Sequence, residues 1–111
     1  ERIGGQAKVV VYILENAAPQ DVVMLSKELR RYPGVVALLA AVNADRTHAH
    51  VLFSASAEAD DVHMGNLLQS VLPALDGKGG GSATVAQGGC ANVAGLAAAL
   101  THVQEQLQAA D

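Results

Sequence analysis

The spacing of apolar and polar positions changes several times along the chain, and each change predicts a new secondary-structure element. Residues 7–14 and 35–42 are continuous aliphatic runs rich in Val, which is typical of strands buried on both faces. Residues 49–55 alternate, so that small and apolar side chains share one face while the other carries His48, His50, Leu52 and Ser54. The turn-forming segment 43–46 precedes this strand and predicts an antiparallel hairpin with the preceding run.

Three further stretches have the period of amphipathic helices. The first begins near Pro19, ends at Pro33-Gly34, and has a predicted buried face of Val22, Leu25, Leu29 and Tyr32. The second follows Asp60-Asp61, which favours a helix N-terminus, ends at Gly77, and has an apolar stripe of Met64, Leu67, Leu68, Val71, Leu72 and Leu75. The third is capped by Asn92 and has apolar positions at Val93, Leu96, Leu100, Val103 and Leu107.

A short strand over residues 83–87, between two glycine-rich turns, completes the predicted order β-α-β-β-α-β-α. This order indicates a single α/β domain, in which helices cover one mixed sheet. A chain of 111 residues fits one domain over 1–111, and its low aromatic content predicts a core of closely packed Ala, Val and Leu. Because the chain starts at Glu1 rather than Met, we expect the C-terminal fragment of a larger protein.

Charge and cysteine content narrow the class of protein further. Acidic residues exceed basic residues by four, which argues against a broadly basic nucleic-acid surface but not against a local one. A single cysteine excludes an internal disulfide framework and fits a reducing, cytoplasmic location. The longest apolar run, residues 35–42, is far shorter than the ~20 residues of a membrane span, so we expect no membrane partner.

Two glycine-rich segments, residues 77–82 and 87–90, are the main candidate for a binding site. As loops, they would let successive N–H groups converge on an anion, and the second would do so beside a helix N-terminus. Lys78 adds a positive charge, and Ser82, Gln87 and Asn92 add neutral hydrogen-bonding groups. The spacing matches neither the Walker A loop nor the dinucleotide-binding fingerprint. Close packing of the backbone would explain the glycines equally well, so both interpretations stay open.

Other candidate residues have simpler explanations. Cys90 precedes a helix N-terminus, which can lower a thiol pKa, but it has no adjacent base and fits a buried small side chain better. His48 and His50 share a strand face without further metal ligands nearby, which favours a solvated face. His63 is expected to be partly exposed in the first turn of its helix.

Two surfaces allow alternative uses. Lys27, Arg30 and Arg31 would contact phosphates together with Lys8 or Lys78, or simply form a solvated helix face. The last helix has the spacing of a coiled-coil seam, but docking on the domain's own sheet is favoured over a dimer contact.

The segment 64–90 resembles the DHH-associated domain, in particular its C-Ala type. The resemblance rests on the motif GKGGG at residues 77–81 and the motif AQGG at residues 86–89, which follow a helix and precede another. Domains of this type close alanyl-tRNA synthetase and the long form of the free-standing alanyl-tRNA editing proteins. The motif segment is slightly more similar to that of the editing proteins.

The resemblance implies an accessory tRNA-binding domain that is not itself an enzyme and needs no cofactor or metal. Its partners would be alanine-type tRNA or another nucleic acid and an upstream catalytic domain, in a parent that is a hydrolase or a ligase. The residues expected to hold the tRNA backbone are Lys78, Gly79, Gly80, Gly81, Ser82, Gln87, Gly88, Gly89 and Asn92.

Two alternatives remain. One is the substrate-binding lobe of a DHH phosphoesterase acting on oligonucleotides or nucleotides, which the resemblance disfavours because Ser82 and Cys90 stand where that family's GGGH motif would place histidine. The other is a dimerisation module, in which the glycines serve packing and the last helix pairs with a second copy.

Overall fold

A computed structural model describes residues 8–32, 34–55, 63–82 and 84–109. The elements follow one another as β1 (Lys8–Leu14), α1 (Pro19–Leu29), β2 (Val35–Val42), β3 (Ala49–Ala55), α2 (Met64–Val71), β4 (Gly77–Gly81), β5 (Val85–Cys90), the 3-10 turn η2 (Val93–Gly95) and α3 (Leu96–Ala109). The predicted α/β fold is confirmed, with one strand more than the sequence analysis expects.

One mixed five-stranded sheet organises the domain, with the strand order β1-β2-β3-β5-β4. β1 and β2 are parallel and are connected through α1, whereas the remaining neighbours are antiparallel. The hairpin predicted between β2 and β3 is confirmed, and the Asn43 N–H donates to the His48 carbonyl oxygen across its turn (3.0 Å). β1 and β4 therefore form the two edges of the sheet.

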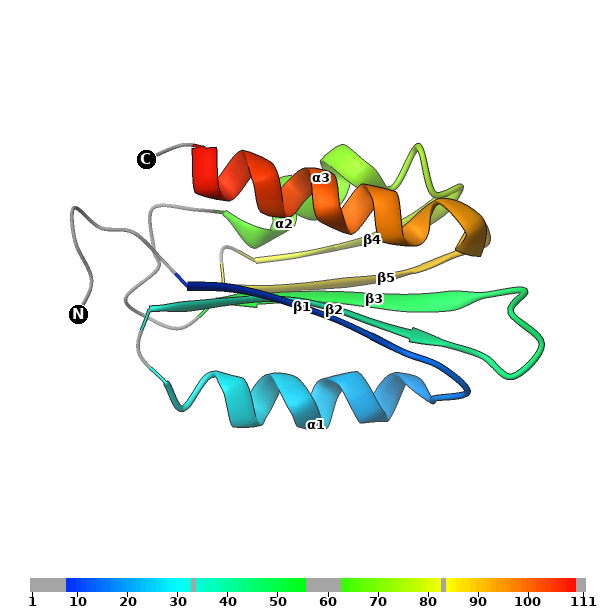
Figure 1. Cartoon of the computed structure of the whole chain (residues 1–111), viewed down its shortest axis with the longest axis horizontal. Helices are drawn as coiled ribbons and strands as arrows, with labels where there is room; N and C mark the ends of the chain where they lie inside the picture. Colours follow the sequence, from blue (N-terminus) through cyan, green and yellow to red (C-terminus); the bar gives the residue numbers. More distant parts are fainter. Residues whose placement is uncertain (1–7, 33, 56–62, 83, 110–111) are drawn as a thin grey trace.

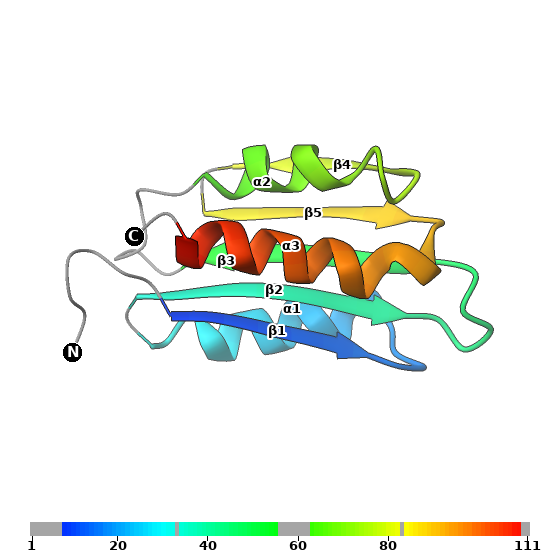
Figure 2. The ribbon, with the colours of Figure 1, turned by 45° about the horizontal axis from the view of Figure 1, so that its top comes forward.

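Helices cover the two sheet faces unequally. α2 and α3 lie on one face, and α1 lies on the other (Figure 1). In the turned view, α1 is behind β1 and β2, while α2 lies along β4 and α3 crosses the middle of the sheet (Figure 2). α1 packs on β2 and β3, and the α1 face of β4 and β5 carries exposed residues. This uncovered half of a sheet face frames the candidate site.

The core is divided between the two faces. β2 is buried along its whole length, because its side chains alternate between a larger cluster under α2 and α3 and a smaller one under α1. Leu38 and Phe53 belong to the larger cluster, whereas Leu39 and Leu52 belong to the smaller. Val93, Leu96, Leu100 and Val103 all pack into the larger cluster, so α3 docks on its own sheet as favoured.

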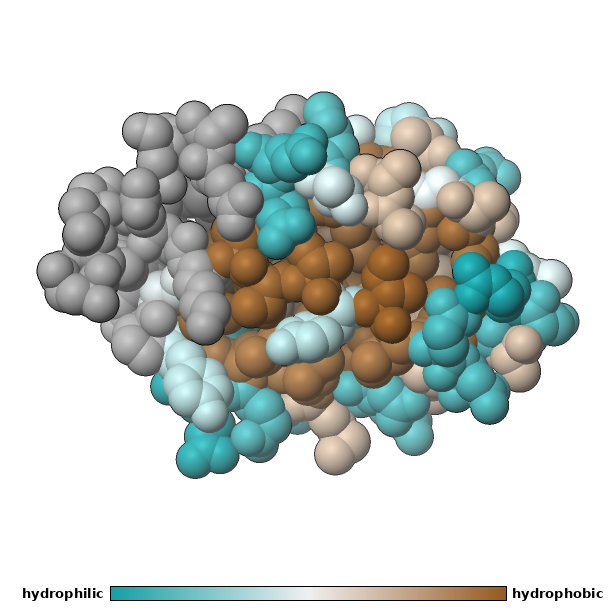
Figure 3. All heavy atoms as spheres, viewed as in Figure 1, coloured by the Kyte–Doolittle hydropathy of each residue, from teal (hydrophilic) through white to brown (hydrophobic). Residues whose placement is uncertain are grey.

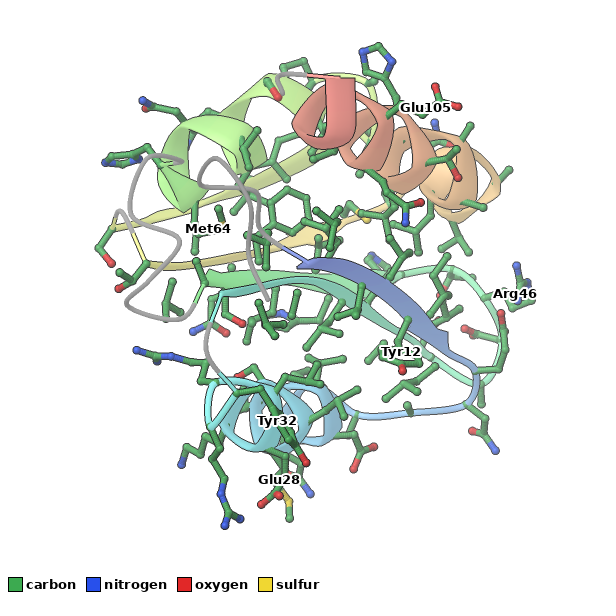
Figure 4. All side chains as sticks on the ribbon, turned by 60° about the vertical axis from the view of Figure 1, so that its left-hand side comes forward. Tyr12, Glu28, Tyr32, Arg46, Met64 and Glu105 are labelled. Carbon is green, nitrogen blue, oxygen red and sulfur yellow. The ribbon has the colours of Figure 1, made fainter. Side chains whose placement is uncertain are left out.

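The predicted face of α1 is correct except at its last position. Pro19 occupies the first turn, and the Asp21 carboxylate accepts from the Ala18 N–H (2.8 Å). Val22 is buried and packs with Leu25 and Leu29 under the sheet. Tyr32 is 62% exposed instead of buried and points away from the sheet (Figure 4). The reason is that the helix ends at Leu29, so the helical phase no longer applies three residues later.

α2 is shorter than its apolar stripe predicts. It ends at Val71, and Leu75 reaches the core from the turn that follows. Asp60 and Asp61, expected at its N-terminus, lie outside the described residues. His63 caps the helix, and its ring Nδ1 accepts from the Asn66 N–H (3.2 Å).

The two glycine-rich segments are strands rather than loops. Residues 77–81 form β4, and the expected second loop is the end of β5, which gives the order β-α-β-β-α-β-β-α. Among the described residues, Gly34 is the only glycine with a positive φ (69°), so the β4 and β5 glycines do not use the left-handed region. The expectation that the two segments form loops is therefore wrong, because every residue of β4 pairs with a residue of β5.

The opposite edge, β1, is apolar. Hydrophobic residues gather between α1 and α3 where β1 faces the viewer (Figure 3). Tyr12 is 47% exposed there and is labelled in Figure 4. Among the described residues, none of the helices is long and apolar enough to cross a membrane.

Candidate functional site

The glycines of β4 and β5 allow an unusually close approach of the two strands. A Cβ added to Gly79 would lie 2.4 Å from the Gly88 Cα, and one added to Gly88 would lie 2.4 Å from the Lys78 carbonyl oxygen. A Cβ on Gly81 would meet the Val85 carbonyl oxygen at 2.3 Å. These distances leave no room for a side chain, so the packing explanation of the glycines holds at these positions.

Two glycines of the same strands are different, because a Cβ added to either would meet other atoms only at ordinary contact distances. The nearest atom to a Cβ on Gly80 would be the Gln69 Nε2 at 3.4 Å, and the nearest to one on Gly89 would be the Ala49 carbonyl oxygen at 4.0 Å. Both belong to the α1 face of the sheet, because Gly89 pairs with His50 and Gly80 with Gln87. Missing side chains therefore leave bare backbone on an exposed surface.

We use the term bare surface for the α1 face of β4 and β5, formed by Lys78, Gly80, Gln87 and Gly89. All four residues are exposed. Lys78 lies opposite Gly89 in the ladder, and Gly80 lies opposite Gln87. The bare surface thus combines accessible backbone, one ammonium group and one amide, and no helix of the described residues covers it.

The free edge of β4 borders the bare surface. Antiparallel ladders alternate between residues that bond to the partner strand and residues whose N–H and C=O groups point outward. Because the Ser82 N–H donates to the Val85 carbonyl oxygen (2.8 Å), the alternation directs the polar groups of Gly79 and Gly81 to the outer edge. The Gly79 carbonyl oxygen accepts there from the Gln69 side chain (2.6 Å).

Three of the predicted site residues hold the backbone in place. Gly88 is buried between the strands. The Ser82 hydroxyl bonds within its own turn, to the Val85 carbonyl oxygen (3.3 Å). Asn92 caps the 3-10 turn by accepting from the Gly95 N–H (3.1 Å) and donates to the Ala74 carbonyl oxygen (2.9 Å). The predicted cap at Asn92 is confirmed, and its side-chain groups are already engaged.

A hollow of about 230 Å³ lies at one end of the bare surface, and the sequence analysis does not identify it. It is formed where the turn before α1, the β2–β3 hairpin and the end of β5 meet, and its lining includes His48, His50 and Gly89. The His50 Nε2 lies 2.7 Å from the Gln87 Oε1. Strand alternation predicts that His48 and His50 share a face, and both line the hollow. The sequence alone does not show that the start of α1 packs beside them and completes it.

Cys90 ends β5 and is buried. Loss of solvation raises the pKa of its thiol, and a backbone hydrogen bond at Ala49 opposes that rise only in part. The expected burial of the thiol is confirmed, and the raised pKa favours the protonated, unreactive form. Within the described part of the chain, no group of three or more His, Cys, Asp or Glu residues is placed to hold a metal ion.

The exposed basic residues are only partly free. Arg31 pairs with Glu28 (3.3 Å), and Arg46 pairs with Glu15. Lys27 and Arg30 are exposed on α1, the helix that shares a sheet face with Lys78. Lys78 forms no ion pair with any residue that the structure describes. It is therefore the cation available on the bare surface.

Comparison with known proteins identifies the family. Residues 6–109 match the DHHA1 domain. The chain belongs to the DHHA1 domain family. The resemblance based on the GKGGG and AQGG motifs is confirmed, and those motifs are the two strands of the bare surface.

Named relatives narrow the type of DHHA1 domain. The chain is 32% identical over 112 residues to an alanine–tRNA ligase of Corynebacterium glutamicum, which covers 98% of the chain and 13% of that protein. It is 34% identical over 93 residues to the ligase of Frankia alni, covering 83% of the chain and 11% of that protein. The chain thus spans about an eighth of these relatives. The C-Ala domain of Aquifex aeolicus alanyl-tRNA synthetase has the same fold, with a TM-score of 0.79, 26% identity and 89% of both chains covered.

Proposed function

We propose that this C-Ala-type domain is a tRNA-binding accessory domain of an alanyl-tRNA synthetase or of an alanyl-tRNA editing protein. The named relatives are alanine–tRNA ligases, and a solved C-Ala domain shares the fold. The observation that carries the proposal is the bare surface, where glycine backbone and Lys78 are exposed on a sheet face that no helix of the described residues covers. Such a surface fits the sugar-phosphate backbone of a folded RNA.

The chemistry of the bare surface suits backbone contacts rather than base stacking. Lys78 offers a positive charge to a phosphate, and the outward N–H groups of Gly79 and Gly81 offer further donors. Gln87 adds an amide on the same face. The surface has no aromatic side chain, so recognition of RNA by shape and backbone is the mechanism it supports. Gly88, Ser82 and Asn92 contribute by fixing the two strands.

Electrostatics predict weak binding by the domain alone. The chain carries a formal net charge of -4, and Lys78 is a single cation on the bare surface. Binding of a polyanion by few cations has a shallow salt dependence and low affinity. An upstream catalytic domain that holds the same tRNA would raise the effective local concentration. The domain therefore acts as an accessory contact, with catalysis supplied by the rest of the parent protein.

A titration with three nucleic acids tests the proposal: alanine tRNA, a noncognate tRNA and a short single-stranded oligonucleotide, each at low and moderate salt. Lys78→Ala removes the cation of the bare surface, and Lys27→Ala removes an exposed cation of α1 as the matched control. We expect tRNA to bind more tightly than the oligonucleotide. We also expect Lys78→Ala to weaken binding and reduce the salt slope by about 1, because one phosphate contact is lost.

Three results would contradict the proposal. An equal loss of tRNA affinity in Lys27→Ala and Lys78→Ala would show that binding depends on the overall charge of the domain rather than on the bare surface. Absence of tRNA binding by the folded domain would remove the proposal altogether. Preference for the oligonucleotide would instead favour the substrate lobe of a DHH phosphoesterase.

A second candidate function, self-association, is favoured by the β1 edge. β1 ends the strand order, and apolar side chains surround it (Figure 3). An unpaired apolar edge strand is a template for another strand. Sedimentation over a range of protein concentrations tests this alternative, and a monomeric mass at every concentration would contradict it.

A further inference from the structure

We propose that the hollow beside the bare surface receives one unstacked nucleobase of the bound RNA. This inference rests on the proposed function, because it concerns the same RNA on the same face of the sheet. It assigns the hollow a ligand of stated chemistry, a planar heteroaromatic ring with hydrogen-bonding groups on its edge.

Small residues form most of the walls. Ala17 and Pro19 come from the start of α1, Ala41 from the end of β2 and Gly89 from the end of β5. Because Gly89 has no side chain, its backbone forms the wall of the hollow at that position, and an added Cβ would lie 4.0 Å from the nearest atom, the Ala49 carbonyl oxygen. The lining is predominantly apolar, which suits a ring that has left its stack and must be shielded from water.

The polar groups lie to one side. With the Gln87 Oε1 as acceptor, the His50 Nε2 is the donor of their 2.7 Å hydrogen bond. In the neutral ring this leaves the His50 Nδ1 as an acceptor and the Gln87 NH₂ as a donor. His50 belongs to the lining, so the edge of its ring complements the edge of a nucleobase, whereas Gln87 is outside the lining and holds that ring in place. The Asn43 side chain also lines the hollow but is occupied by the hairpin, where its Oδ1 accepts from the Thr47 N–H (2.9 Å) and the His48 N–H (3.0 Å).

The charges around the hollow indicate which part of a nucleotide it would hold. The lining contains no Lys or Arg side chain, so the hollow itself suits a neutral ring rather than a phosphate. Lys78 lies directly opposite Gly89 in the ladder, just outside the lining. A nucleotide with its base in the hollow would therefore keep its phosphate on the bare surface, near the one cation found there. The hollow and the bare surface are continuous through Gly89.

The test uses the four ribonucleoside 5′-monophosphates as probes, with ribose 5-phosphate as the probe that lacks a base. Each is titrated into the isotope-labelled chain, and the amide signals of Ala17, His50 and Gly89 are followed by NMR. We expect at least one mononucleotide to shift all three signals in a saturable way. Ribose 5-phosphate is expected to leave them unchanged.

Two valine variants supply a matched pair. Gly89→Val places a side chain into the hollow, whereas Ala97→Val enlarges an exposed side chain of α3, on the other face of the sheet. Filling a pocket that has room for a flat ring is expected to weaken mononucleotide binding about tenfold in Gly89→Val, and Ala97→Val is expected to bind like the unmodified chain. Gln87→Ala, which removes the partner of the His50 ring without filling the hollow, is expected to weaken binding several-fold because a hydrogen bond no longer orients that ring.

The inference is overturned if no mononucleotide shifts the three signals, if ribose 5-phosphate shifts them equally, or if Gly89→Val and Gln87→Ala bind like the unmodified chain. Binding of tRNA by the same proteins separates this result from failure of the proposed function. If tRNA binding persists and depends on Lys78 while mononucleotides do not bind, the nucleobase site is wrong and the tRNA-binding role stands.

Discussion

The thiol of Cys90 illustrates how one side chain is controlled by its position in the fold. Cys90 lies on the sheet face that α2 and α3 cover, within the larger core cluster, and only 3% of the residue is exposed. The first helical residues after it form a 3-10 turn at Val93–Gly95, so no long helix begins directly at the sulfur. Desolvation therefore dominates, and it raises the pKa of the thiol.

A raised thiol pKa makes stability depend on pH in a defined direction. Below the ordinary thiol pKa of about 8.5 both states are protonated, and the free energy of unfolding is unaffected. As the pH rises above it, the unfolded chain ionises first and loses its proton more readily than the native state. We expect the free energy of unfolding to fall as the pH rises above about 8.5, and to fall by more in the unmodified chain than in Cys90→Ala.

Urea unfolding of both proteins at several pH values measures this difference, and Cys90→Ala controls for the titration of every other group. Identical pH dependence in the two proteins would show that the thiol is not desolvated. Slow reaction of native Cys90 with a disulfide reagent, relative to the unfolded chain, is the accompanying expectation.

Residue-level expectations from sequence succeeded where the local pattern was sufficient. The shared face of His48 and His50 followed from strand alternation, and the cap at Asn92 followed from residue type. Tyr32 could not be placed in this way. Its position depended on where α1 ends, and the stop signal at residues 33–34 gives that point only to within a turn.

At the scale of elements, β4 is the segment that local reasoning misplaced. Glycine is poor in strands because it loses more backbone entropy than other residues, so the motif GKGGG predicts a loop when taken alone. In the fold, β5 pairs with it residue by residue. α2 adds two contacts, since the Gly65 N–H donates to the Ser82 carbonyl oxygen (2.9 Å) and Gln69 donates to Gly79 (2.6 Å). Partners distant in sequence therefore decide the conformation.

Most other elements were predictable because they bury a regular apolar pattern. β1, β2, β3, α1 and α3 all appear where the period of the sequence places them. The order of strands in the sheet was not predicted, and this order puts the two glycine segments side by side. The family resemblance supplied the motifs, but only the register shows which glycines serve packing and which lie bare.

The neighbouring glycines 88 and 89 test that distinction directly. A Cβ on Gly88 would lie 2.4 Å from the Lys78 carbonyl oxygen, whereas one on Gly89 would have no atom closer than 4.0 Å. We expect Gly88→Ala to lower the free energy of unfolding by about 1–3 kcal/mol, because the strands must separate to accept the methyl group. Gly89→Ala is expected to be neutral or to stabilise by about 0.5 kcal/mol through the smaller loss of backbone entropy.

Chemical denaturation of the two variants and the unmodified chain gives both values. Equal destabilisation by the two substitutions would contradict the distinction between a closely packed Gly88 and an accessible Gly89. A neutral Gly88→Ala would contradict it as well.

At the scale of the whole molecule, unequal coverage of the sheet leaves the bare surface that we propose as the tRNA contact. α2 and α3 complete the larger core on one face, whereas α1 packs over β2 and β3 on the other. The remaining part of that face is the bare surface, and the hollow lies at its end, lined by Ala17 and Pro19 at the start of α1. The relatives of the family suggest the RNA partner that we propose, and the face that we propose as its contact is the part of the sheet that no helix of the described residues covers.

The central claim is that tRNA lies on the bare surface, and mapping the contact by NMR tests it most directly. The isotope-labelled chain is titrated with alanine tRNA, and intensity losses and shifts are assigned residue by residue. We predict the largest effects at the amides of residues 78–81, Gln87 and Gly89, with His50 affected at the hollow and with these effects reduced in Lys78→Ala. Effects centred on β1 and α3, with the amides of β4 and β5 unchanged, would contradict the account.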